Sequence, residues 1–393
     1  MNKKNYIKFF LFCFILRVPI LIIYGDNALQ NEWGILVNNI IQNKTLAILN
    51  FGDFYLPNLW MPPLYAYFLY LISFPFESVN NYYINFVLII QCFISAISAL
   101  IFYKILQNFY SKKISLYGSL IYTCFPLNVY ASVQISSITL TMFLSVLFLF
   151  YVINIIKFNK YKYLILFSII SGLLILTRRE FIIFFIVTNF FLFFFAKINL
   201  KKILLVILIA SLTVSPYIIR NYIIFDKIII QAGFGYNVWK AYNPLAKVEG
   251  STIVSEELKI KINNIEKNKF YRINEDKVYL NQAIAYLLND PLKYFKLYLL
   301  RLFSYYFIDL NSSEPNYYNF FHILPNIFLG ILVTLGLFKY DKNSLIFNYL
   351  LLIFVLYIFI ISSFAVLPRY KLYLLPFQII FSLAYLKKIS WYK

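Results

Sequence analysis

Apolar runs long enough to cross a lipid bilayer recur along most of this chain. A transmembrane helix needs about 20 predominantly apolar residues, because the hydrocarbon core is roughly 30 Å thick. After a first helix that ends near Ile23, the runs lie at 82–106, 115–131, 136–156, 161–177, 180–196, 202–219, 323–338, 344–363 and 370–387. The pattern predicts an all-α polytopic membrane protein, with about ten spans in a single domain over 1–393.

The composition supports this class and excludes others. Of the 393 residues, 62% are hydrophobic and only 13% are charged, whereas soluble domains are about 45–50% apolar and about 25% charged. The three cysteines, Cys13, Cys92 and Cys124, all lie in apolar runs and form no CxxC pair. A soluble enzyme, a disordered chain and a disulfide-stapled domain are therefore excluded.

The net charge of +20 gives information about membrane topology rather than about a ligand. Lysines gather near 3–8, 104–113, 157–162, 197–202, 339–342 and 387–393, and such clusters mark cytoplasmic loops. The loop 24–81 has the opposite balance, with four acids against Lys44. We expect a multi-pass inner (plasma) membrane protein with both termini cytoplasmic. Because the basic residues border the membrane, no nucleic-acid partner is expected.

Two outer segments are too long to be simple connectors. The first, 24–81, contains the amphipathic stretches Trp33–Ile41 and Pro63–Leu71, which favour helices lying in the interface with the membrane lipids. The second, 220–322, is rich in aromatic and charged residues, and its last helix, Tyr294–Leu310, is expected to lie flat on the outer leaflet or only partly within it. No internal repeat of the kind found in secondary transporters is present.

The first outer loop carries the acids Asp26, Glu32 and Asp53. Carboxylates at the mouth of a membrane bundle can act as a general base or bind a cation, although a solvated loop also carries acids. The single His322 excludes a histidine cluster, and the acids show no metal-ligand spacing. No cofactor is therefore predicted, and a divalent metal is left without support.

Basic residues also stand at the outer helix ends, where the positive-inside rule disfavours them. A single outer arginine is explained by snorkelling to lipid headgroups. Several of them beside an acidic loop favour a polyanionic ligand, because the planar guanidinium suits phosphate. They are Arg178, Arg179, Arg220, Arg369 and Lys371.

Short motifs spread over nearly the whole chain resemble, in order, those of the GT-C glycosyltransferases. The branch they resemble is the bacterial one related to dolichyl-phosphate-mannose protein mannosyltransferases and aminoarabinose transferases. The similar pieces are Glu32-Trp33 to Asn39 with Pro62-Pro63-Leu64-Tyr65, Phe125-Pro126 with Tyr130, Gly172-Leu173-Leu174 to Arg178, Pro216 to Tyr222, Gly235 to Trp239, Asp290-Pro291 to Tyr294, and Pro368-Arg369 with Pro376.

The resemblance implies a GT-C-like bundle with an active site on the outer (periplasmic) side. It implies a transferase that moves a sugar from a polyprenyl-phosphate donor to a lipid, glycan or protein acceptor, with the prenyl tail in a groove between helices. The family's usual acid is replaced by Leu29-Gln30, so Asp26 or Glu32 is expected to be the base. Ser136-Ser137 is a second departure, because relatives often carry an acid after the serine.

The remaining site residues follow from the same resemblance and from chemistry. Positive charge must stabilise the departing lipid phosphate, which gives that role to Arg178, Arg220, Arg369 and Lys371. Tyr236, Asn237 and Trp239 are expected to bind a sugar ring, with an interfacial aromatic belt as the alternative reading. For the whole protein, a flippase or transporter of lipid-linked saccharides and an inactive transferase relative stay open as alternatives.

Overall fold

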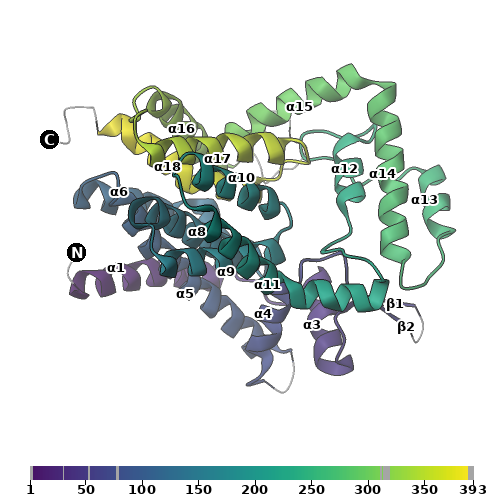
Figure 1. Cartoon of the computed structure of the whole chain (residues 1–393). Coiled ribbons are helices and arrows are strands. Elements are labelled where there is room, and N and C mark those ends of the chain that lie inside the picture. The colour runs from purple at the N-terminus through teal and green to yellow at the C-terminus, as the bar shows by residue number, and fades with distance from the viewer. Residues whose placement is uncertain are drawn as a thin grey trace.

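The computed structural model describes residues 3–29, 31–51, 54–76, 79–309, 312 and 319–387. Most of these residues are helical, and the long helices pack into a bundle from one end of which a second group of helices projects (Figure 1). Helix α1, which begins the described chain, and helix α18, which ends it, reach the opposite end of the bundle (Figure 1). We call the projecting side the outer end.

The bundle contains most of the apolar runs found in the sequence. Its helices are α1 (Lys3–Ile15), α2 (Val18–Tyr24), α5 (Asn81–Leu106), α6 (Lys112–Cys124), α7 (Pro126–Ser132), α8 (Ile138–Phe158), α9 (Tyr161–Thr177), α10 (Phe181–Phe194), α11 (Leu200–Phe225), α16 (Phe320–Leu337), α17 (Leu345–Ser362) and α18 (Leu375–Leu386).

By length and composition, 6 helices of the described chain can cross a membrane: 4–24, α5, α8, α11, α16 and α17. Helices α4 (Pro63–Ser73), α9 and α10 are apolar but shorter. The count of about ten spans is therefore not confirmed and stays a prediction.

Three predicted spans are interrupted in the structure, and proline or a buried charge lies at each break. The run 115–131 is divided at Phe125 into α6 and α7, because Pro126 has no N–H for the helix to use. The run 370–387 begins as the 3-10 helix η2 (Pro368–Leu374) and continues as α18. The first helix breaks before Val18, and the side chain of Arg17 at this break is fully buried.

The first outer loop folds into helix α3 (Asn31–Asn43), a hairpin of β1 (Ala47–Phe51) and β2 (Phe54–Pro57), and helix α4. Helices α3 and α4 coincide with the two amphipathic stretches that the sequence indicates. The strands pair antiparallel, with Leu49 opposite Leu56. The hairpin was not predicted, because its apolar residues do not alternate cleanly along either strand. Of the acids expected in this loop, Asp53 and Glu77 lie outside the described residues.

The second outer segment forms α12 (Phe234–Tyr242), α13 (Glu256–Asn263), α14 (Tyr271–Asn289) and α15 (Pro291–Tyr306). Helix α15 leads from α14 back to the bundle (Figure 1). A small apolar core around Trp239, Leu258 and Tyr279 holds α12, α13 and α14 together. Another one joins Leu59 of the first outer loop to Phe225 of α11 and Ile273 of α14. The two outer segments therefore pack on each other.

Candidate active site at the outer end

The 3-10 helix η2 forms the centre of an arginine–tyrosine cluster. Arg178, which follows α9, donates to the Tyr373 hydroxyl at 3.0 Å and pairs with Glu180 at 2.5 Å. Its guanidinium also lies 4.5 Å from the centre of the Tyr370 ring and 5.1 Å from the centre of the Tyr373 ring. Such cation–π contacts and a close ion pair hold the guanidinium in one orientation. We call Arg178, Glu180, Tyr370 and Tyr373 the Arg178 cluster.

Two further cations lie near Tyr370 of the Arg178 cluster. Arg369 is exposed, and its guanidinium lies 5.4 Å from the centre of the Tyr370 ring. Lys240 comes from α12. Burial lowers the pKa of Lys240, the neighbouring Tyr370 raises it, and the positive charge of Arg369 lowers it again. Tyr370 thus lies among Arg178, Arg369 and Lys240, which come from three separate parts of the chain.

Asp26 is held by the turn between α7 and α8. One carboxylate oxygen, Oδ2, accepts the backbone N–H of Ile135 at 2.6 Å, and the backbone N–H of Asp26 donates to the carbonyl of Val133 at 3.3 Å. Gln134 donates from its side chain to the carbonyl of Tyr24 at 2.7 Å. Both α7 and α8 contact η2. Asp26 is therefore half-buried at the outer end with a fixed main-chain geometry.

Glu32, the second predicted acid, lies in the first turn of α3. Burial raises the pKa of Tyr236 on α12, and the nearby carboxylates of Glu275 and Glu32 raise it further. Tyr236 and Lys240 are four residues apart on α12, so they share one helix face. The charge of Glu32 acts on the pKa of Tyr236, and the charge of Arg369 acts on that of Lys240.

The predicted sugar-binding trio is divided by the fold. Trp239 is only 1% exposed, and its ring packs against Tyr236 and Tyr279. It therefore supports Tyr236 from inside the protein. Tyr236 is half-buried, with its ring centre 4.9 Å from that of Trp60. Asn237 is exposed, and its side-chain amide donates to the carbonyl of Gly233 at 2.7 Å. Tyr236 with Trp60 is therefore the aromatic pair that a ligand can reach.

Arg220 makes contacts other than those we expected. Its guanidinium donates to the carbonyls of Asn58 at 3.0 Å and Leu46 at 3.1 Å, and to the Asn221 side chain at 2.7 Å. These acceptors belong to α11 and to the ends of the hairpin, so Arg220 fastens the first outer loop to the bundle. The same donors cannot also bind a phosphate. The assignment of Arg220 to phosphate therefore has no support in this geometry.

Lys371 likewise points into the protein. It is 6% exposed, and its ammonium group donates to the carbonyl of Phe307 at 2.6 Å. This contact joins η2 to the end of α15. The structure therefore brings Arg178 and Arg369 together around Tyr370, and it gives Arg220 and Lys371 contacts with the main chain.

Sequence reasoning missed three residues of this region. Lys240 is one helical turn from Tyr236, and that spacing is the signal that could have identified it. Trp60 precedes two prolines and was visible only as part of a motif. Arg272 lies over the Trp60 ring at 4.8 Å and pairs with Glu275 at 2.5 Å, and nothing in the sequence connects it with Trp60.

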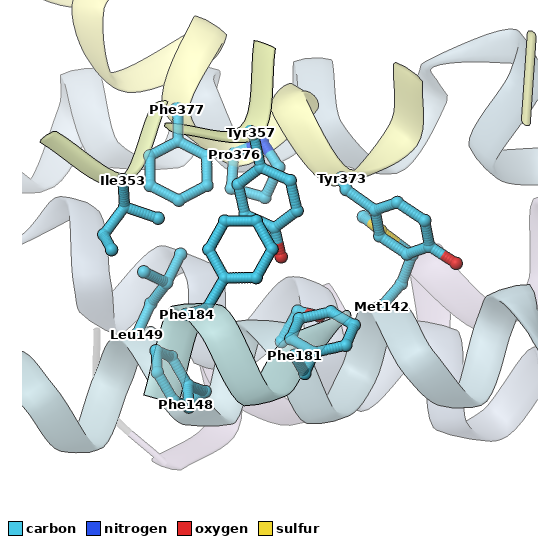
Figure 2. Close-up of a pocket in the computed structure, with 11 residues that line it drawn as sticks. Met142, Phe148, Leu149, Phe181, Phe184, Ile353, Tyr357, Tyr373, Pro376 and Phe377 are labelled. Carbon is cyan, nitrogen blue, oxygen red and sulfur yellow. The ribbon is translucent and has the colours of Figure 1, made fainter. Parts of the chain in front are cut away.

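An apolar cavity beneath the Arg178 cluster has a volume of about 10 Å³ (Figure 2). Aromatic side chains fill most of this space, and the rings of Phe184 and Tyr357 stack with centres 3.9 Å apart. Tyr373 lies at one side with its hydroxyl pointing away from the cavity (Figure 2). A space of this size holds about one water. It is too small for a prenyl tail in this conformation.

In the described part of the chain, no three His, Cys, Asp or Glu side chains come together in a way that could hold a metal ion.

The fold and the site define a polytopic helical protein with a carboxylate and an arginine–tyrosine cluster at its outer end. The sequence model of the dolichyl-phosphate-mannose-protein mannosyltransferase family matches residues 61–219. This segment includes Arg178, whereas Asp26, Glu32, Tyr236 and Arg369 lie outside it. No curated protein matches the sequence.

Among solved structures, the chain is similar to the oligosaccharyltransferase of Archaeoglobus fulgidus in its apo form. The TM-score is 0.59 at 14% sequence identity, and the match covers 98% of this chain and 50% of the archaeal chain. At this identity the likeness shows the fold alone, and our chain spans about half the length of that protein. With the family match, it confirms the predicted resemblance to the GT-C glycosyltransferase superfamily.

Proposed function

We propose that this protein is an integral-membrane glycosyltransferase that takes its sugar from a polyprenyl-phosphate donor. The observation that carries the proposal is the group of cations around Tyr370, where the guanidinium groups of Arg178 and Arg369 lie 4.5 Å and 5.4 Å from the ring centre. Sugar transfer from a lipid phosphate needs a base on the acceptor side of the anomeric carbon and positive charge on the phosphate side.

The reaction is a displacement at the anomeric carbon. A base removes the proton from an acceptor hydroxyl or amine, the acceptor forms the new bond to the anomeric carbon, and the bond to the phosphate oxygen breaks. We assign the base to Asp26, because the backbone N–H of Ile135 fixes its carboxylate at the turn between α7 and α8, and both of these helices contact η2. General-base catalysis of this kind contributes about 10²- to 10⁴-fold.

The leaving lipid phosphate carries the charge that develops in the transition state. Arg369 and Lys240 supply positive charge without an acidic partner in the ion pairs of the described residues. Arg178, already paired with Glu180, orients Tyr370 and Tyr373 beside them. Preorganised cations at the leaving group are among the largest contributions to catalysis, because they need no reorganisation during the reaction.

The acceptor side is formed by Glu32, Tyr236 and Trp60. Aromatic rings bind the apolar faces of sugars, and a carboxylate accepts hydrogen bonds from hydroxyl groups. A lipid, a glycan or a protein side chain would all satisfy this chemistry. The lysine pattern supports an inner-membrane protein with cytoplasmic termini, which places the site on the periplasmic side.

Transfer from a labelled polyprenyl-phosphate hexose by the purified full-length protein tests the proposal. We expect Asp26→Asn to lower the rate by about 100-fold or more, and Glu32→Gln to raise the KM of the acceptor. Asp226→Asn, which changes an exposed acid at the tip of α11, is the matched control and should leave transfer unchanged.

The outcomes separate the alternatives. Unchanged transfer in the Asp26 variant with a large loss in the Glu32 variant would make Glu32 the base in place of Asp26. Full activity in both would remove the base from this site. If no lipid-linked sugar is transferred but one is moved across proteoliposome membranes, the protein is a flippase.

A further inference from the structure

Gln91 is a buried amide in the middle of a membrane-spanning helix. It lies on α5 and is 1% exposed. Its carbonyl oxygen accepts the Tyr65 hydroxyl at 2.7 Å, and its NH2 group donates to the carbonyls of Gln134 at 2.8 Å and Ser132 at 3.4 Å. A polar side chain is costly at this depth, so a complete set of partners indicates that its contacts matter.

These contacts join three segments that are distant in sequence. Tyr65 belongs to α4 of the first outer loop, Gln91 to α5, and residues 132–134 to the turn between α7 and α8. The side chain of Gln91 is therefore the point where the first outer loop and that turn are fixed to one membrane helix.

The other side of the same turn holds Asp26. Gln134 accepts from Gln91 with its carbonyl, while its own side chain donates to the Tyr24 carbonyl at 2.7 Å. On either side of Gln134, the turn accepts the Asp26 N–H at Val133 and donates the Ile135 N–H to the Asp26 carboxylate. One short turn thus connects the buried amide to the carboxylate that we assign as the base.

We propose that Gln91 is a positioning residue that fixes the Asp26 carboxylate through the α7–α8 turn. It touches neither the donor nor the acceptor. Losing its amide removes the acceptor of the Tyr65 hydroxyl and the side-chain donor to the Gln134 carbonyl, so the turn moves to regain hydrogen bonds. The catalytic part of this inference rests on the proposed function, whereas the placement of Asp26 does not.

Hydrogen exchange tests the placement without any substrate. In Gln91→Leu, we expect the amides of Asp26 and Ile135 to exchange about tenfold faster or more than in the parent protein, because their partners are released. Ser98→Ala is the matched control. Ser98 is buried on the same helix and bonds to the Tyr122 hydroxyl at 2.9 Å, outside this network, so its loss should leave both amides unchanged.

A double-mutant cycle tests the catalytic consequence. Gln91→Leu alone should lower kcat by about 10- to 100-fold with little change in the KM of the donor, because the donor cations lie elsewhere. Added to Asp26→Asn, the same substitution should cost almost nothing further, because its effect acts through that carboxylate. Melting curves confirm that each variant is folded.

The two proposals fail in different ways. Unchanged exchange at Asp26 and Ile135 in a folded Gln91→Leu protein would overturn the positioning role, whatever the activity. Equal, additive losses in both backgrounds would assign Gln91 a general structural role and overturn it too. Faster exchange in a protein that transfers no sugar would leave the placement standing and reject the proposed function.

Discussion

Arg220 and Arg369 look alike in sequence, since each is an arginine next to the outer end of an apolar run. The fold uses them differently. Arg220 gives its donors to the carbonyls of Leu46 and Asn58, whereas Arg369 is exposed with its guanidinium beside the ring of Tyr370. One arginine holds the architecture together, and the other is available to a ligand. An arginine at an outer helix end can therefore be recognised in the sequence as unusual. The sequence does not tell whether it holds the fold together or binds a ligand.

Removing the exposed arginine should have the largest effect on activity. We expect Arg369→Ala to lower kcat/KM for the lipid-phosphate donor by about 100-fold, while the melting temperature stays within error because the side chain packs on little. Steady-state kinetics with varied donor measure this. Lys296→Ala on α15 is the matched control, an exposed outer cation outside the cluster. An Arg369 variant with normal donor kinetics would place the phosphate elsewhere.

The second arginine should show the reverse behaviour. Arg220→Ala removes charged hydrogen bonds to two carbonyls and one amide, and we expect it to cost about 2 kcal/mol of stability after allowance for its partial exposure. The expected result is a lower melting temperature, with kcat/KM of the folded fraction reduced less than tenfold. A strong donor KM effect in a protein of unchanged stability would contradict the comparison and return Arg220 to the phosphate site.

Lys240 offers the smallest effect and a pH test. Burial lowers the pKa of Lys240, so its charge is lost at a lower pH than that of an ordinary lysine. We expect donor affinity to weaken as the pH rises through that value, by less than about tenfold because Arg369 stays charged. Lys240→Arg should remove this alkaline limb from a plot of kcat/KM against pH. An unchanged profile would show that Lys240 does not contact the donor.

Several structural features were predictable because they depend on local sequence. The apolar runs predicted most of the membrane helices, and the amphipathic stretches predicted α3 and α4. The resemblance to GT-C transferases was also visible, because its motifs are short and keep their order along the chain.

Other features were hidden because their causes are distant in sequence. The β1–β2 hairpin is held by Arg220, which lies more than 160 residues away. Trp239 is in a motif that suggested sugar binding, but Tyr279 and Leu258 cover its ring. Gln91 is one amide in an apolar run, and its partners Tyr65 and Gln134 come from opposite directions along the chain.

The sequence by itself determined that this chain is a membrane protein and which of its residues stand in unfavourable places. Burial of apolar runs in lipid is a local property, and so is the cost of a charge beside them. Only the tertiary structure decided which of those charges bind the chain itself and which are left for a substrate. An arginine has a limited number of hydrogen-bond donors. Whether main-chain carbonyls more than 160 residues away already accept from them depends on how the helices and outer loops pack.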